Sequence, residues 1–130
     1  MTRSFEESSS RILGAAIEVH RALGPGFLEK TYAHALRVAL EMGGVPYVAE
    51  CDVPLIFAGR SVGSYRVDLI VAGQIVVELK AVRRLEELHF AQLRAYLTAT
   101  GLQVGLLLNF NAPILTVKRV VRGRNECPPE

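Results

Sequence analysis

The spacing of apolar residues changes along this 130-residue chain, and those changes restrict its fold more than any other feature. Up to Met42 the apolar residues recur every three or four positions, which is typical of helices with one buried face. Over 47–81 they alternate with polar residues or form short runs, which is typical of strands. The helical spacing returns at 85–100, and strand-like segments follow at 103–109 and 114–121. The chain therefore combines helices with strands.

Capping and turn residues divide these segments into elements. Ser8, Ser9 and Ser10 are candidate N-caps of a first helix, which ends at 24–26, and a second helix is expected at about 27–42. The strands of the following segment are expected to form an antiparallel meander, at 47–50, 53–58, 64–71 and 75–81. Strands grouped in this way and covered by helices predict an α+β (mixed α/β) fold. Its central mixed sheet is flanked by helices, and a crossover places the late strands beside the early hairpin.

Half of the residues are hydrophobic, which is enough for one domain with its own core. We expect that domain at 10–122, between a disordered or capping segment at 1–9 and a flexible tail at 123–130. Cys51 and Cys127 lie far apart and match no metal-ligand or disulfide spacing, which fits a reducing cytoplasm. The start of the chain lacks an apolar signal core, and no apolar run approaches the roughly 20 residues that cross a bilayer. We therefore expect a cytoplasmic protein without membrane contact.

Charged residues interrupt two otherwise apolar strands on either side of a tight turn at 72–74. If these three residues form the loop, Asp68 lies opposite Glu78. Arg66 then lies opposite Lys80, and both like-charge pairs are unfavourable by themselves. Because side chains alternate along a strand, Glu78 and Lys80 share one face. Asp68, Glu78 and Lys80 are therefore predicted to converge.

Two carboxylates within reach of each other make a site for a hard divalent cation such as Mg²⁺ or Mn²⁺, whose charge removes their repulsion. Beside them, Lys80 is placed to orient or deprotonate an attacking water and to stabilise negative charge on a phosphate. The pattern therefore predicts a site that hydrolyses phosphoesters. The same spacing also fits solvent-exposed charges on the outer face of a half-buried hairpin, and the residues alone leave that alternative open.

The context of these charges resembles a known family. D-x9-E-L-K at 68–80 is similar to the bipartite signature of the PD-(D/E)XK nuclease superfamily, in which the acidic residue ends or bends one strand and E-x-K lies on the next. Within G-P-G-F-L-E-K-T-Y, Gly26, Glu29 and Tyr32 have the spacing that names the GxxExxY family, whose small single domains are assigned to this superfamily. The similarity continues through H-F-A-Q-L-R-A-Y-L to G-L-L-L-N-F at 105–110. It implies a restriction-endonuclease-like core.

The resemblance also implies a role for individual residues. Asp68 and Glu78 would be metal ligands, with the Leu79 carbonyl as a third. Lys80 would be the catalytic base or the phosphate-stabilising group. Glu29, from the second helix, would approach the same metal.

The helix after E-x-K supplies further candidates. The resemblance implies that Gln92 and Tyr96 line the substrate cleft. His89 precedes Gln92 by three residues, so it shares that helix face and is expected at the rim of the site. His20 and His34 lack metal-ligand spacing and are expected to pack or to face solvent.

Two residues of the GxxExxY motif also have simpler explanations. A carboxylate such as Glu29 near a helix start is stabilised by the helix dipole, typically by about 0.3 to 1 kcal/mol, without any function. Tyr32 belongs to the apolar stripe of its helix, so we expect it in the core with its hydroxyl hydrogen-bonded.

The expected function is divalent-metal-dependent hydrolysis of phosphodiester bonds in nucleic acid, with DNA favoured over RNA and RNA left open as a substrate. One alternative is a non-catalytic nucleic-acid-binding or regulatory module that keeps the site geometry. Another is an interaction protein working as a homodimer, since so short a domain offers limited surface. A third is hydrolysis of another phosphoester. The net charge of +2 is too small to indicate tight non-specific binding, and no helix-turn-helix or zinc finger indicates base reading.

Overall fold

The computed structural model describes residues 4–122, so the predicted tail at 123–130, with Cys127, lies outside the described residues. Its elements, in chain order, are α1 (Phe5–Leu23), α2 (Glu29–Met42), β1 (Tyr47–Phe57), β2 (Arg60–Val71), β3 (Ile75–Lys80), α3 (Glu87–Thr100), β4 (Val104–Asn109) and β5 (Thr116–Val121). No helix in this part of the chain is long and apolar enough to cross a membrane.

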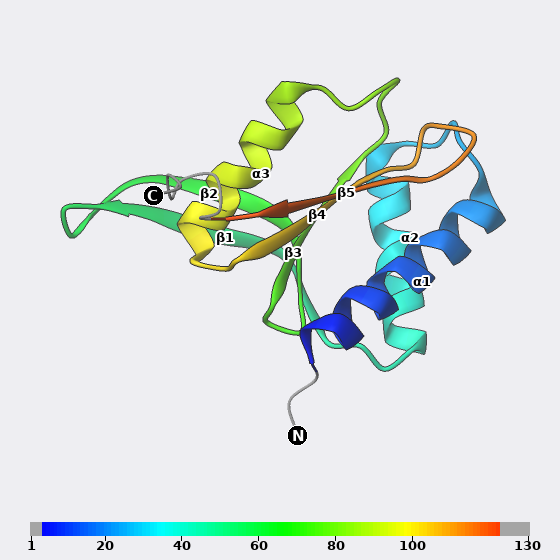
Figure 1. Cartoon of the computed structure of the whole chain (residues 1–130), viewed down its shortest axis with the longest axis horizontal. Coiled ribbons are helices and arrows are strands. Elements are labelled where there is room, and N and C mark those ends of the chain that lie inside the picture. Colours follow the sequence, from blue (N-terminus) through cyan, green and yellow to red (C-terminus); the bar gives the residue numbers. More distant parts are fainter. Residues whose placement is uncertain (1–3, 123–130) are drawn as a thin grey trace, which may run out of the picture.

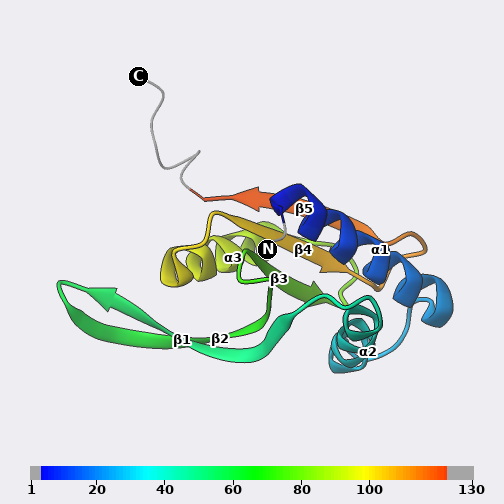
Figure 2. The same ribbon diagram turned by 90° about the horizontal axis from the view of Figure 1, so that it is seen from below.

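The strands form one five-stranded sheet in the order β1-β2-β3-β4-β5. Neighbouring strands are antiparallel except β3 and β4, which are parallel and joined through α3. Figures 1 and 2 show α1 and α2 together at one end, with α3 separate from them. The predicted mixed sheet, flanking helices and crossover are therefore confirmed.

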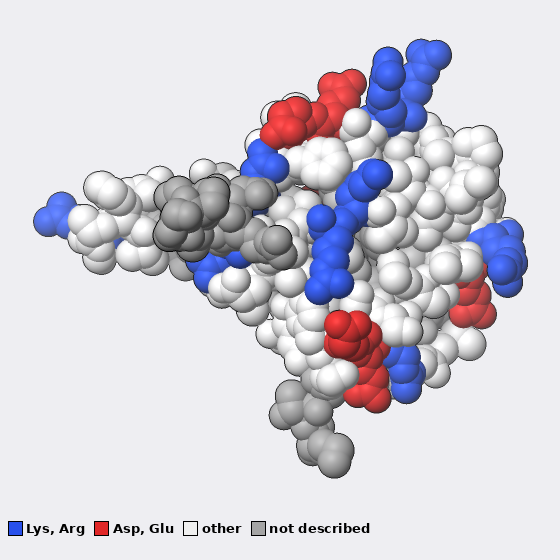
Figure 3. Space-filling model, viewed as in Figure 1, with Lys and Arg blue, Asp and Glu red and all other residues white. Residues whose placement is uncertain are grey.

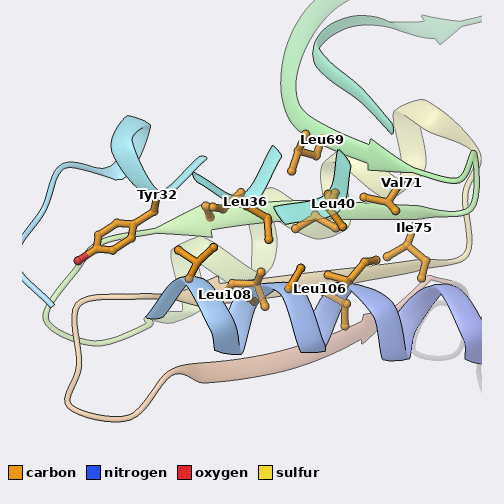
Figure 4. Packing of buried hydrophobic residues seen from close by; sticks show 14 of the residues in the cluster. Tyr32, Leu36, Leu40, Leu69, Val71, Ile75, Leu106 and Leu108 are labelled. Carbon is orange, nitrogen blue, oxygen red and sulfur yellow. The ribbon is translucent and has the colours of Figure 1, made fainter. Parts of the chain in front are cut away.

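Two hydrophobic clusters cover the two faces of the sheet. The larger joins α1 and α2 to the sheet, where Leu36 and Leu40 of α2 pack near Leu69 and Leu106 and Tyr32 lies at one end of the cluster (Figure 4). The smaller joins α3 to the opposite face and includes residues of β2, β3, β4 and β5. Because both faces are covered, the central strands are apolar almost throughout.

Strand β3 divides its side chains between these clusters as the alternation predicts. Ile75, Val77 and Leu79 belong to the cluster with α1 and α2, whereas Val76 belongs to the cluster with α3. Glu78 lies two residues after Val76 and therefore faces the same side as α3, near the end of the strand at Lys80. Lys80 also contacts α3, through Gln92, so the prediction that Glu78 and Lys80 share one face of the strand is confirmed.

The start of α1 differs from the prediction. The helix begins at Phe5, so residues 5–9 are helical, and Ser4 rather than Ser8, Ser9 or Ser10 is its N-cap. The Ser4 hydroxyl accepts the Glu7 N–H at 3.0 Å, and the Glu7 carboxylate accepts the Ser4 N–H at 3.2 Å. This reciprocal capping box outcompetes the later serines.

The strand count also differs, because the segments predicted at 47–50 and 53–58 are one strand, β1. Its Pro54 is compatible with the position of β1 at the edge of the sheet, where one side of the strand has no partner to pair with. Ala58 and Gly59 both have positive φ, of 53° and 78°, which suits a two-residue hairpin turn into β2. The β1–β2 hairpin is therefore longer than predicted and projects from the body (Figure 2).

Two glycines give opposite predictions for stability. A Cβ on Gly105 of β4 would lie 2.8 Å from Leu93 Cδ1, whereas a Cβ on Gly14 of α1 would meet nothing within 4 Å. We expect Gly105→Ala to lower the free energy of unfolding by roughly 1–3 kcal/mol through overpacking. Gly14→Ala should raise it by roughly 0.5–1 kcal/mol, because glycine is disfavoured within a helix. Denaturant unfolding measures both values.

The cause of the first effect can be checked in the same assay. Because Leu93 is the side chain that Gly105→Ala would strike, the cost of Gly105→Ala should shrink when Leu93 is already Ala. An unchanged cost in that background would contradict the proposed contact.

Candidate active site

The hairpin between β2 and β3 has the register that the sequence predicts. Leu69 pairs with Val77 and Val71 with Ile75, around the loop at 72–74. Directly beyond these pairs, the carboxylate of each acidic residue accepts a hydrogen bond from a main-chain N–H of the other strand. The Asp68 N–H donates to Glu78 Oε1 at 3.3 Å, and the Leu79 N–H donates to Asp68 Oδ2 at 3.0 Å. The predicted convergence of the two carboxylates is therefore present.

Strand β2 changes direction at Asp68. Leu69 packs with α1 and α2, yet Val67, two residues earlier, packs with α3. On β1 the pairing passes from Ala49 with Leu69 to Cys51 with Val67, and the intervening Glu50 has a positive φ of 52°. A non-glycine residue in this region is strained, and such strain is often found at functional sites.

Burial alters the ionisation of both carboxyl groups. Glu78 is 4% exposed, and burial, then the Asp68 charge, raises its pKa to about 8. Burial also raises the pKa of Asp68, although the Leu79 N–H and the Lys80 charge oppose that rise. In the absence of a cation, both groups therefore hold their protons to a higher pH than ordinary carboxyl groups do.

Side chains of α3 complete one side of the pair. Lys80 Nζ donates to Gln92 Oε1 at 3.1 Å. Burial and the charges of Glu78 and Asp68 raise the pKa of the Tyr96 hydroxyl, which is also hydrogen-bonded to Gln92. The structure thus brings Gln92 and Tyr96 to the predicted catalytic residues.

Glu29 and His89 lie at the rim. Partial burial raises the pKa of Glu29, and the charges of Lys80, Asp68 and His89 also act on it, so its carboxyl group lies near all three. His89 Nδ1 accepts the Glu86 N–H at 2.9 Å and thereby helps to cap α3. His89 therefore has a structural contact as well as a place near the site.

Arg66 does not lie where the sequence predicted it, opposite Lys80. The β2–β3 pairing ends at Leu69, and Arg66 instead contacts two acidic residues of the edge strand, Asp52 at 3.4 Å and Glu50 at 4.0 Å. The bend at Asp68 turns this part of β2 away from β3, so the expected repulsion does not arise.

The donor set fits a hard cation in part. Among residues 4–122, no three side chains of His, Cys, Asp or Glu are grouped closely enough to hold a metal ion. Glu29 is therefore not gathered into one shell with Asp68 and Glu78. Mg²⁺, however, is commonly held by only one or two carboxylates, with waters and substrate phosphates as its other ligands. The pair Asp68 and Glu78 suits that mode, and the Leu79 carbonyl as a ligand stays a prediction.

Sequence reasoning missed the residue that fixes the end of β3. The buried Asn109 side chain accepts the Val82 N–H at 3.0 Å and donates to the Val82 carbonyl at 2.9 Å. Next to it, the Phe110 N–H donates to the Lys80 carbonyl at 2.9 Å. These contacts hold the main chain on both sides of Ala81. The available signal was an asparagine directly after the apolar run of β4.

Tyr32 has the core role that the sequence predicted. It is fully buried, and its ring stacks on Phe110 with centroids 4.7 Å apart. Its hydroxyl donates to the Gly24 carbonyl and accepts the Phe27 N–H at 3.1 Å. Gly26 between them has a φ of 112°, which favours glycine. The motif thus fixes the loop that sets Glu29 at the start of α2.

The other histidines also behave as expected. His20 is buried, and its Nε2 lies 2.8 Å from the Ala112 carbonyl oxygen, while His34 is exposed on α2.

Comparisons with known proteins identify the class that this fold and site define. Residues 6–121 match the PD-(D/E)XK nuclease superfamily, and the chain belongs to that superfamily. No curated protein matches the sequence.

Two solved structures share the fold. The alkaline exonuclease LHK-Exo from Laribacter hongkongensis has a TM-score of 0.55 and 13% identity, over 97% of this chain and 74% of that chain. SSO0001 also has a TM-score of 0.55, with 20% identity over 75% of this chain and 51% of that chain. The match thus spans about half the length of SSO0001. The predicted restriction-endonuclease-like fold is confirmed.

The raised pKa of Glu78 predicts a pH dependence of stability. The folded state holds this proton up to about pH 8, whereas an ordinary glutamate loses it near 4.5. Stability contributed by protonation is therefore complete below pH 4.5 and is lost as the pH rises to about 8. Without metal, the free energy of unfolding should fall over this window by up to about 1.4 kcal/mol per pH unit.

Glu78→Gln should flatten that fall, because its amide does not titrate, while Glu18→Gln on the surface of α1 should leave it unchanged. Urea unfolding at a series of pH values measures the slope. Equal slopes for wild type and Glu78→Gln would show that Glu78 titrates normally.

Tyr32→Phe tests the core role of the motif tyrosine. The variant leaves the Phe27 N–H and the Gly24 carbonyl without their partner, so we expect a loss of roughly 1–3 kcal/mol in denaturant unfolding. Tyr47→Phe is the matched control, because the Tyr47 hydroxyl meets Glu41 at the exposed surface. A loss no larger than that of the control would show that the Tyr32 hydroxyl does not stabilise the loop between Gly24 and Phe27.

Proposed function

We propose that this protein is a divalent-metal-dependent nuclease that hydrolyses phosphodiester bonds in DNA, with RNA as the alternative substrate. The observation that carries the proposal is the pair of the half-buried Asp68 and the buried Glu78, whose carboxylates accept N–H groups across the hairpin, near the charge of Lys80. Burying two carboxylates together is unfavourable for folding alone, and a divalent cation offsets that cost. Membership of the nuclease superfamily and the fold shared with a protein named as an alkaline exonuclease support the same function.

Gly26, Glu29 and Tyr32 further support placement in the GxxExxY family within that superfamily. By the pattern of that family, Glu29 would approach the metal site from the start of α2. Its carboxyl group already lies in the field of Asp68 and Lys80.

The chain's own residues would share the work as follows. Asp68 and Glu78 would hold Mg²⁺ or Mn²⁺, with the Leu79 carbonyl beside them. The bound ion would supply Lewis-acid polarisation of the phosphate oxygens. Lys80, oriented by Gln92, would position the attacking water and neutralise charge that develops on the phosphate.

Tyr96 and His89 would act on the substrate side. The Tyr96 hydroxyl is hydrogen-bonded to Gln92 and lies near enough to Glu78 and Asp68 for their charges to raise its pKa, so it would donate to a phosphate oxygen held at the pair. His89 would contact the substrate at the rim. A homodimeric assembly stays a prediction.

Cleavage tests the proposal. Circular plasmid, single-stranded DNA and RNA are incubated with Mg²⁺ or Mn²⁺ and wild-type protein, Glu78→Gln, Lys80→Ala or the surface control Glu18→Gln. We expect wild type and Glu18→Gln to cut DNA, and Lys80→Ala to lose roughly 10²–10⁴-fold in rate. Glu78→Gln should also lose Mn²⁺ binding in calorimetry, a result independent of cleavage.

Cleavage that survives Glu78→Gln would exclude this site. Nucleic-acid binding without cleavage by wild type, at matched folding, would instead favour the non-catalytic binding module.

A further inference from the structure

Helix α2 presents three basic side chains next to the carboxylate pair. Lys30, His34 and Arg37 are spaced by four and three residues, so they lie on one face of the helix. All three line a cavity of about 230 Å³ whose wall also includes Asp68 and Glu50. None of the three was predicted from the sequence to belong to the site.

Arg37 is incompletely paired in this cavity. One terminal nitrogen contacts Glu50 Oε2 at 3.0 Å, and its side chain is 21% exposed. Its Nε, although buried, has no hydrogen-bond partner among residues 4–122. A guanidinium offers its donors in a fork that matches the oxygens of a phosphate. The guanidinium lines the cavity and is partly exposed there, so it fits an anionic group that enters the cavity.

Glu50 can release Arg37 without losing all of its cationic partners. Its other oxygen, Oε1, lies 4.0 Å from Arg66 Nη1. The positive φ of Glu50 belongs to the bend that brings it near Asp68. Glu50 thus holds Arg37 beside the carboxylate pair while leaving part of the guanidinium available.

The distribution of charge on the face drawn in Figure 3 and the low net charge favour a local binding site over a broad one. On the face drawn in Figure 3, Lys and Arg side chains are interspersed with Asp and Glu and form no continuous basic patch. A net charge of +2 agrees with that distribution. Specific phosphate contacts near the site would then have to position the backbone.

We propose that Lys30, His34 and Arg37 form a subsite for backbone phosphates of the nucleic acid strand adjoining the scissile phosphate. This inference rests on the proposed nuclease function. Lys30 and Arg37 are separated by roughly 10 Å along the helix axis at 1.5 Å per residue. That length spans about three nucleotides at 3.4 Å per step. As a phosphate enters, the Arg37 guanidinium exchanges its contact with Glu50 for the phosphate oxygens.

The salt dependence of binding tests this subsite separately from cleavage. All variants carry Glu78→Gln and are measured in EDTA, so neither cleavage nor metal contributes. Fluorescence anisotropy reports the binding of a labelled 20-nucleotide single-stranded DNA and the matching duplex over a range of salt concentrations. Each phosphate contact contributes about 0.7–0.9 to the slope of log K against log salt.

Arg37→Ala and Lys30→Ala should each reduce that slope by about 0.7–0.9. The matched control is Arg119→Ala on β5, at the opposite edge of the sheet, which removes the same charge and should leave the slope unchanged. Arg37→Lys keeps the charge and should keep the slope, while binding more weakly because the fork is lost. Glu50→Gln should tighten binding, because it weakens the competitor for Arg37.

Several outcomes would overturn the subsite. The first is an equal loss of slope in Arg37→Ala and Arg119→Ala, which would show only an effect of net charge. The second is weaker binding by Glu50→Gln with unchanged unfolding, and the third is no DNA binding by the parent. Cleavage by the wild type, measured independently, shows whether the nuclease function survives any of these failures.

Discussion

Strand β3 lies at the centre of the sheet with helices over both faces, and every other element is arranged around that position. Five of its six residues are buried, and one of those five is Glu78. An apolar residue there would satisfy the packing with less cost, because a buried carboxyl group has to lose its water. The main chain replaces part of that water, since the N–H groups of Asp68 and Leu79 donate across the hairpin.

The end of β3 is fixed as firmly as its middle. Asn109 at the end of the parallel strand β4 and Phe110 directly after it bind the main chain at Val82 and Lys80, and Phe110 itself stacks on Tyr32. Tyr32 in turn fastens the loop that precedes α2. A continuous set of contacts therefore links the E-x-K strand to the start of α2. This explains why motifs that are distant in sequence belong to one site.

The sequence predicted the parts that depend on local pattern. Alternation and a three-residue loop were enough to place Asp68 near Glu78, because both act within one hairpin. Prediction failed where tertiary context decides. The segments predicted at 47–50 and 53–58 form one strand because Cys51 and Asp52 between them also pair with β2, which no local pattern indicates. The position of Arg66 depends on a bend that no periodicity reveals, and Arg37 meets Glu50 only once α2 has packed.

The bend at Asp68 explains how helices on opposite faces reach the same group. A flat strand would direct Asp68 towards α3 alone, since alternate residues face opposite sides of a sheet. In the bent strand, Asp68 lies close enough to Tyr96 of α3 for its charge to raise the pKa of that hydroxyl. It also lines the cavity beneath Arg37 of α2. The strained backbone of Glu50 lies opposite this bend on the edge strand. Local strain in β1 therefore accompanies the bend that lets residues of both α2 and α3 approach Asp68.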